Sequence, residues 1–247
     1  MTHTARTSLQ SLQINTLLNS MAVLALLTGI ALMITRIFAA PIGYLAQSLA
    51  VFVGCLLILA RFLSQHQPLT RFGAANTVTL LRAGIAALFA GLIGRPAPAP
   101  AWAWTMAALA IIALLLDGLD GWLARRGNMR SPLGARFDME VDAFFILILA
   151  ALVWQFGKAG IWILLSGMMR YGFVLLSYAL PWLNQPLPPR RRRQTVCVIQ
   201  TAALAGCLTP PLIPPISTIL AGFALGLLAL SFAVDVAWLW RRDRDAG

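Results

Sequence analysis

Long apolar runs, separated by short polar or charged stretches, dominate the pattern along the 247-residue chain. Each run approaches the ~20 residues that an α-helix needs to cross the hydrocarbon core of a bilayer. The runs cover residues 17–35, 42–60, 76–94, 101–124, 138–156, 160–180, 196–213 and 217–240. Hydrophobic residues make up 60% of the chain. The pattern therefore predicts an all-α integral membrane protein and not a soluble domain.

The first apolar run has two interpretations. A basic residue, Arg6, precedes it and the run ends in Phe-Ala-Ala-Pro, as in a secretory signal peptide. However, Arg36 interrupts the run before any cleavage site, and a second apolar run follows within a few residues. We therefore expect residues 1–70 to form an uncleaved two-helix hairpin with a connector. Residues 71–247 should form a six-helix membrane domain.

The basic residues are distributed unevenly about the predicted spans. The chain has 19 lysines and arginines against 8 acids, a net charge of +11. If the loop near residue 128 is cytoplasmic, alternation leaves only Arg36, Arg95 and Lys158 outside. The cytoplasmic set is then Arg6, Arg61, Arg71, Arg125, Arg126, Arg130, Arg136, Arg190, Arg191, Arg192, Arg193, Arg241, Arg242 and Arg244. This bias predicts cytoplasmic termini in an inner (plasma) membrane, with an anionic lipid leaflet and no nucleic acid as partner.

Acidic residues gather in one short stretch, 117–142, which reads DGLDGWLARRGNMRSPLGARFDMEVD. It holds five of the eight acids in the chain: Asp117, Asp120, Asp138, Glu140 and Asp142. The runs on either side are apolar. Carboxylates next to hydrocarbon are costly and need a compensating partner. One or two divalent cations would serve, and an all-oxygen ligand set favours Mg²⁺, Mn²⁺ or Ca²⁺ over Zn²⁺.

The spacing of these acids places them on helix faces. Asp117 and Asp120 are three residues apart, with Gly121, Ala124 and Arg125 on the same predicted face. Gly134, Asp138 and Asp142 follow at intervals of four residues, which is one face of a second helix. Because a loop rich in helix breakers joins the two segments, we expect an antiparallel pair that points four carboxylates at a common centre.

Written as a pattern, the stretch is D-x2-D-G-x2-A-R-x8-G-x3-D-x3-D. It resembles the signature of the CDP-alcohol phosphotransferase (CDP-alcohol phosphatidyltransferase) family at all of its fixed positions. The resemblance implies a six-helix catalytic core, here over 71–247, with two extra transmembrane helices before it. It also implies phospholipid biosynthesis: metal-dependent transfer of a phosphatidyl group from CDP-diacylglycerol to a small alcohol, with release of CMP. A homodimer is expected by the same resemblance.

The resemblance also assigns roles within the pattern. It implies that Asp117, Asp120 and Asp138 bind Mg²⁺ or Mn²⁺, with two ions expected, and that Asp142 is a further ligand or the general base. The predicted donor-binding residues in this stretch are Gly121, Ala124, Arg125 and Gly134. Gly121 and Ala124 would face the cytidine, and Arg125 would contact the diphosphate.

A polar pattern at the start of the third run has two interpretations. Asn76, Thr79 and Arg82 recur at intervals of three residues, roughly on one helix face. The family has a similar Pro-Asn-x-x-Thr-x-x-Arg pattern beside its active site, although Ala75 replaces the proline here. By that resemblance Asn76 and Thr79 bind the donor. The alternative is helix capping, with Arg82 extending to the lipid headgroups.

Other arginines are candidates for the acceptor site. Arg170 lies inside a predicted span, where an arginine is a functional candidate or one half of an ion pair, with Asp235 as a possible partner. Arg192 and Arg193 belong to a run of four that either contacts lipid headgroups or binds a phosphate. This surplus of positive charge favours a phosphorylated acceptor, and glycerol 3-phosphate is the leading candidate. Serine, inositol phosphate, choline and phosphatidylglycerol remain alternatives.

A divalent cation transporter is the rival function from another class. Transporters bind their cation near the middle of the bilayer, between broken helices. The acids of residues 117–142 instead lie at predicted cytoplasmic span ends, beside arginines that would repel a permeating cation. We therefore predict an enzyme with its active site at the cytoplasmic face.

Overall fold

The computed structural model describes residues 3–67, 69–126, 131–185 and 191–246. For residues 3–9, 120–126, 184, 191, 245 and 246 it describes the backbone only. These parts of the chain are helical and contain no strand, which confirms the all-α prediction.

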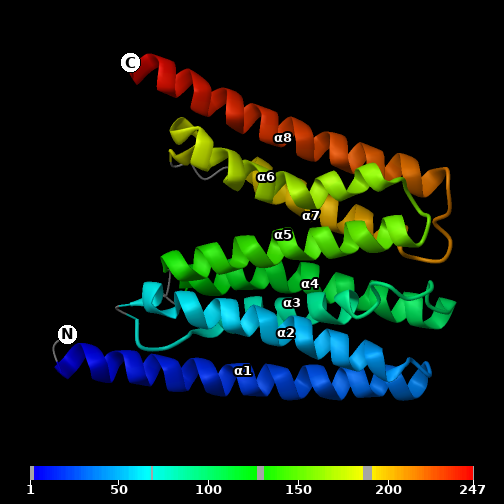
Figure 1. Ribbon diagram of the computed structural model, residues 1–247, viewed down its shortest axis with the longest axis horizontal. Helices are drawn as coiled ribbons and strands as arrows, with labels where there is room; N and C mark the ends of the chain where they lie inside the picture. The colour runs from blue at the N-terminus through cyan, green and yellow to red at the C-terminus, as the bar shows by residue number, and fades with distance from the viewer. Residues whose placement is uncertain (1–2, 68, 127–130, 186–190, 247) are drawn as a thin grey trace. The chain divides into compact units, whose positions relative to one another are not determined.

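Eight α-helices follow one another along the described chain (Figure 1). They are α1 (His3–Ile37), α2 (Ile42–Phe62), α3 (Ala74–Ala90), α4 (Pro100–Arg126), α5 (Pro132–Gln155), α6 (Leu165–Ala179), α7 (Arg191–Cys207) and α8 (Ile216–Ala246). Three short 3-10 helices lie between them: η1 (Leu63–His66), η2 (Ile161–Leu164) and η3 (Pro181–Asn184). Each of the eight predicted runs thus overlaps one α-helix, although several helix ends differ.

Membrane-spanning character is clear for part of this set. Five described helical segments are long and apolar enough to cross a membrane: Gln10–Ile37, Ile42–His66, Pro100–Leu119, Ile161–Ala179 and Ile216–Arg244. α3 is a shorter apolar helix. The chain is therefore a multi-pass membrane protein. The spans predicted for α3, α5 and α7 stay predictions: α3 and α7 are only 17 residues long, and the first half of α5 carries four charged residues.

By its internal contacts the described chain divides into two compact units, residues 1–142 and 143–247, with the division inside α5. This division, after residue 142, differs from the boundary that we predict after residue 70, at the end of the N-terminal hairpin and connector. That boundary stays a prediction. Each unit is described by itself below.

In the first unit, α3 is the central helix and packs against α1, α2 and α4 (Figure 1). Most of its residues are buried, although it is only 17 residues long. At Gly91, just after α3, an added Cβ would lie 2.8 Å from the Tyr44 ring of α2. Neighbouring helices, and not lipid, therefore surround α3, so its polar side chains must find their partners inside the unit.

The N-terminal hairpin is hydrogen-bonded to α3 at both ends of that helix. At the α3 start, Asn15 of α1 accepts a hydrogen bond from the Phe72 amide, 2.9 Å away. Near the α3 end, Gln47 of α2 donates to the Ala90 carbonyl at 2.9 Å. Arg95, which follows α3, donates to the Gln47 amide oxygen at 2.5 Å. The hairpin is thus an integral part of this unit.

In the second unit, α7 packs on α8, and α6 contacts η3 and α8. Lys158 lies in the turn after α5 and bonds to the turn between α7 and α8. Its ammonium donates to the carbonyl oxygens of Leu212 and Thr209, at 2.7 and 3.3 Å. Its own carbonyl accepts from the Ser217 hydroxyl at 2.6 Å. These bonds satisfy backbone carbonyls that the helix ends leave free.

Candidate active site

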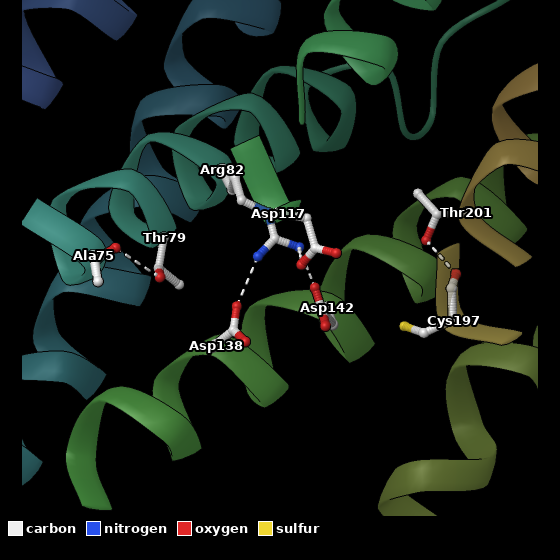
Figure 2. Close-up of polar contacts among 8 residues, drawn as sticks. All are labelled: Ala75, Thr79, Arg82, Asp117, Asp138, Asp142, Cys197 and Thr201. Carbon is white, nitrogen blue, oxygen red and sulfur yellow. Dashed lines mark hydrogen bonds and ion pairs between the residues drawn. The ribbon is translucent and has the colours of Figure 1, made fainter. Parts of the chain in front are cut away.

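One arginine and three carboxylates form a cluster in the first unit (Figure 2). The Arg82 guanidinium of α3 lies 2.8 Å from Asp117 Oδ1 and 2.7 Å from Asp138 Oδ1. It also forms an ion pair with Asp142. One oxygen of each of the three acids lies within 4.8 Å of the others. We call these four residues the aspartate cluster.

Helical spacing accounts for the arrangement of the aspartate cluster. Asp117 lies on α4, whereas Asp138 and Asp142 are one turn apart on α5, on the face that points to Arg82 (Figure 2). Arg82 reaches them from the buried helix α3, and its side chain is only 6% exposed. The acids are more open, at 25%, 37% and 24% exposure for Asp117, Asp138 and Asp142. The buried partner is therefore the cation, and the accessible groups are the acids.

The charges in the aspartate cluster fit a divalent cation. Three ionised carboxylates would carry three negative charges against the single positive charge of Arg82, so acids outnumber the cation in this cluster. The group offers only oxygen ligands, which suit Mg²⁺ or Mn²⁺. Because a charge in a low-dielectric surrounding is expensive to leave unbalanced, the excess favours binding of a hard cation.

Two of the predicted donor-binding residues lie deep in the first unit. Asn76 and Thr79 are 6% and 2% exposed. The Asn76 amide donates to the Phe72 carbonyl at 2.6 Å. Figure 2 shows the second bond, in which the Thr79 hydroxyl donates to the Ala75 carbonyl at 3.1 Å. Neither caps the helix, because α3 begins at Ala74 after Gly73 and has no side-chain cap. The capping alternative is therefore wrong.

A third predicted donor-binding residue, Gly134 of α5, packs closely against Asn76 of α3. A Cβ at Gly134 would lie 2.7 Å from the Asn76 amide oxygen. Any larger residue would have to displace this buried side chain. Glycine at this position thus lets the start of α5 approach the start of α3.

The remaining residues of the pattern fall where only the backbone is described. Asp120 lies in α4 one turn after Asp117, and Gly121, Ala124 and Arg125 follow in the same helix. Their side chains lie outside the described residues. Their predicted roles as metal ligand and donor-binding residues stay predictions.

The arginines considered for the acceptor site belong to the second unit. Arg170 of α6 is half-buried. Asp235 of α8 pairs with Arg192 at 2.5 Å and with Arg193 at 3.9 Å, and not with Arg170 as considered above. Arg192 also donates to the Ser231 carbonyl at 3.0 Å. We call Arg192, Arg193 and Asp235 the arginine cluster.

Two residues have a larger part in the first unit than their sequence context indicates. Arg82 does not extend to lipid headgroups but binds the three acids, so the headgroup alternative is wrong. Its spacing from Asn76 and Thr79 was the available clue. His66, which looks isolated in the sequence, is fully buried and hydrogen-bonded. No local pattern pointed to it.

Comparison with known proteins supports the same family as the sequence pattern. The model of the family described as CDP-alcohol phosphatidyltransferase matches residues 72–238. No curated protein and no solved structure shows significant similarity to the chain. The match extends over more than half of the chain and includes every member of the aspartate cluster. The protein thus belongs to the CDP-alcohol phosphatidyltransferase family, divalent-metal-dependent transferases of phospholipid synthesis that use CDP-alcohol substrates and an alcohol acceptor.

Proposed function

We propose that the protein transfers a phosphatidyl group from CDP-diacylglycerol to the hydroxyl of a small alcohol and releases CMP. The observation that carries this proposal is the aspartate cluster. Three accessible carboxylates converge from α4 and α5, in the stretch that carries the family pattern. A diphosphate is rich in negative charge, so a site made of acids can accept it only together with cations.

The cations that suit this site are Mg²⁺ or Mn²⁺, with two ions expected. Asp117, Asp138 and Asp142 would hold them, and Asp120, one helical turn after Asp117, would be the fourth ligand. Bound there, such ions would neutralise the diphosphate and stabilise the negative charge that develops on the departing CMP. Arg82 would hold the carboxylates in place from their buried side, since it contacts all three described acids.

The transfer is a substitution at the lipid-side phosphorus. A bond forms between the acceptor oxygen and that phosphorus, and the bond to the CMP oxygen breaks. The proton of the acceptor hydroxyl goes to Asp142 if that residue is the general base. Asp142 remains a ligand, a base or both in this proposal. Its neighbour Arg82 would orient the carboxylate in either role.

The donor site would extend from the aspartate cluster along α3 and α4. Asn76 and Thr79 are buried on α3, and Gly134 of α5 contacts Asn76. We propose that they support the donor from the buried side, with Gly121 and Ala124 against the cytidine. Arg125 would bind the diphosphate, for which a guanidinium is well suited.

The acceptor proposed is a phosphorylated alcohol, with glycerol 3-phosphate first. The support is the supply of arginine in the second unit: Arg170, and Arg192 and Arg193 with a single acid between them. A phosphate would gain from these charges, whereas the cation of choline would be repelled.

We propose that the active site faces the cytoplasm, with both termini on that side, in a homodimer within the inner (plasma) membrane. The support is the distribution of basic residues described above. A cysteine at Ala97 should react with an impermeant reagent added outside intact cells. Labelling only after permeabilisation would contradict this orientation. Cross-linking in membranes would test the dimer.

The decisive experiment measures CMP release by the purified protein from CDP-diacylglycerol and glycerol 3-phosphate. Release should require Mg²⁺ or Mn²⁺, stop with EDTA, and resist a zinc-selective chelator, because the ligand set is all oxygen. Full turnover in EDTA without added metal would contradict the metal proposal. Absence of CMP release with glycerol 3-phosphate, serine, inositol phosphate, choline and phosphatidylglycerol alike, with metal present, would contradict the reaction itself.

A further inference from the structure

The connector between α2 and α3 contacts the start of α5 through one buried histidine. His66 ends η1, and its ring has no exposed surface. One ring nitrogen, Nε2, lies 2.9 Å from the Arg71 carbonyl oxygen. The other, Nδ1, lies 2.7 Å from the Ser131 hydroxyl oxygen. The ring thus joins the connector to a residue 65 positions further along the chain.

The chemistry of the partners fixes the direction of each bond. A carbonyl oxygen only accepts, so Nε2 carries the hydrogen. Nδ1 of the neutral ring then accepts the hydroxyl hydrogen of Ser131. The Ser131 oxygen in turn accepts from the Gly134 amide at 3.0 Å. Ser131 is therefore the N-cap of α5, with Pro132 as the first helical residue, and His66 holds its hydroxyl in the capping orientation.

The capped turn begins the face of α5 that carries the aspartates. Gly134 packs against Asn76 of α3, and Asp138 and Asp142 follow it at one-turn intervals. His66 and Asn76 therefore hold this turn from two sides. Because a helix is stiff over two turns, its position at Gly134 sets where both acids meet Arg82.

The same N-terminal region also holds the start of α3, which carries Arg82. Asn15 accepts from the Phe72 amide at 2.9 Å. Asn19 accepts from the Thr77 hydroxyl at 3.0 Å. The hairpin and connector thus contact the two helices whose register determines the distance between Arg82 and the acids.

We propose that His66 is a positioning residue, through which the N-terminal hairpin and connector fix the start of α5 and thereby the aspartate cluster. This inference rests on the proposed function of that cluster as a metal site. It assigns a task to residues 1–70, which lie entirely before the part that matches the family.

Two substitutions of His66 separate positioning from packing. The amide of Asn extends about as far as Nδ1, so His66→Asn can still accept from Ser131. The amide of Gln extends about as far as Nε2, so His66→Gln can still donate to the Arg71 carbonyl but not accept from Ser131. Both lose the same buried ring. A second pair of substitutions changes the partner of His66: Ser131→Thr keeps the hydroxyl and Ser131→Ala removes it.

The measurements are Mn²⁺ affinity by electron paramagnetic resonance and, separately, kcat and KM for CMP release, on monodisperse protein. We expect His66→Gln and Ser131→Ala each to weaken Mn²⁺ binding and lower kcat about tenfold, with the donor KM changed less. His66→Asn and Ser131→Thr should stay within about threefold of wild type. His66→Gln combined with Ser131→Ala should cost no more than Ser131→Ala alone, because removing the hydroxyl already breaks the bond that His66→Gln breaks.

Equal losses in His66→Asn and His66→Gln would overturn the inference, because they would show a packing role only. Wild-type Mn²⁺ affinity in both His66→Gln and Ser131→Ala would also overturn it. If the His66 variants do not fold, wild-type Mn²⁺ affinity in Ser131→Ala alone would overturn the inference. A wild-type protein that neither binds Mn²⁺ nor releases CMP would instead overturn the proposed function, and this inference with it.

Discussion

The aspartate cluster and the arginine cluster are opposite solutions to the cost of charge in a membrane protein. In the first, one buried cation, Arg82, serves three acids that are about one quarter to one third exposed. In the second, one buried acid, Asp235, serves two arginines that are each 32% exposed. The buried partner balances only part of the charge in each case. The accessible groups are acids in one unit and arginines in the other.

This contrast indicates what each cluster can bind. An excess of accessible carboxylates favours a cation, whereas an excess of accessible guanidinium groups favours a phosphate or an anionic lipid headgroup. A salt bridge that only stabilised the fold would need no such excess. Equal numbers of acidic and basic side chains would neutralise each other, and fewer charges would then have to be desolvated. The predictions below change one member of a cluster at a time.

The largest effect should follow the loss of an accessible acid. Asp138→Asn keeps the shape of the side chain but removes a charged oxygen ligand. We expect CMP release to fall about 100-fold or more, because the diphosphate would lose its correct placement. Glu140→Gln, on the same helix but outside the aspartate cluster, is the matched control and should stay within about twofold. Retention of more than about a tenth of wild-type rate by folded Asp138→Asn would refute the metal-site assignment.

The next effect concerns the buried cation. Arg82→Gln leaves three acids without their guanidinium, so mutual repulsion should destabilise the metal-free protein. Mn²⁺ should then raise the midpoint of thermal unfolding by about 4 °C more than in wild type, because the ion supplies the missing charge. Arg95→Gln, which removes an arginine beyond the opposite end of α3, should show the wild-type response. A Mn²⁺ effect no larger than in wild type would contradict this charge argument and leave Arg82 with the positioning role alone.

Loss of the acid in the arginine cluster should lower thermal stability and leave metal binding unchanged. Asp235→Asn leaves Arg192 and Arg193 without their buried acid. Since both arginines are partly exposed, the loss should be modest, about 3 °C in the unfolding midpoint. Mn²⁺ affinity should be unchanged. Asp243→Asn, near the exposed end of α8, should have no effect and serves as the control. A loss of Mn²⁺ binding in Asp235→Asn would mean that the two clusters are not independent.

The helices and the meeting of three aspartates could be predicted from sequence because both depend on local periodicity. Apolar runs near 20 residues and acids spaced by four on α5 need no knowledge of distant contacts. Helix ends were less predictable. α1 extends from His3 to Ile37 instead of 17–35. Apolar periodicity did not reveal its polar first part, in which Asn15 bonds to the Phe72 amide at the start of α3.

Pairings between distant residues could not be predicted. Nothing near Asp235 in the sequence distinguishes Arg192 from Arg170 as its partner, because the choice depends on how α6, α7 and α8 pack. His66 looks isolated for the same reason: Ser131 lies 65 residues away. Arg82 was an intermediate case. Its spacing from Asn76 and Thr79 placed it on the correct face, but only the packing of α3 shows that this face is turned toward the acids.

The smallest expected effect concerns the acceptor, and it tests whether accessible arginine charge has a ligand. Asp235 balances one of the two charges of Arg192 and Arg193. Arg170 is a further half-buried cation in the same unit. We expect Arg170→Ala to raise the KM for a phosphorylated acceptor about fivefold and to change the KM for CDP-diacylglycerol little, because the proposal assigns Arg170 to the acceptor and Arg125 to the diphosphate of the donor.

A panel of labelled acceptors, offered with CDP-diacylglycerol to wild type, Arg170→Ala and Arg170→Lys, measures this effect. Arg170→Lys keeps the charge but loses the planar fork, so its KM should fall between the other two. A neutral or cationic acceptor gains nothing from Arg170, so its KM should be the same in all three proteins. Brisk turnover with serine or choline, and none with any phosphorylated alcohol, would eliminate the proposed acceptor. The aspartate cluster would still define the reaction, since it acts on the donor whichever hydroxyl attacks.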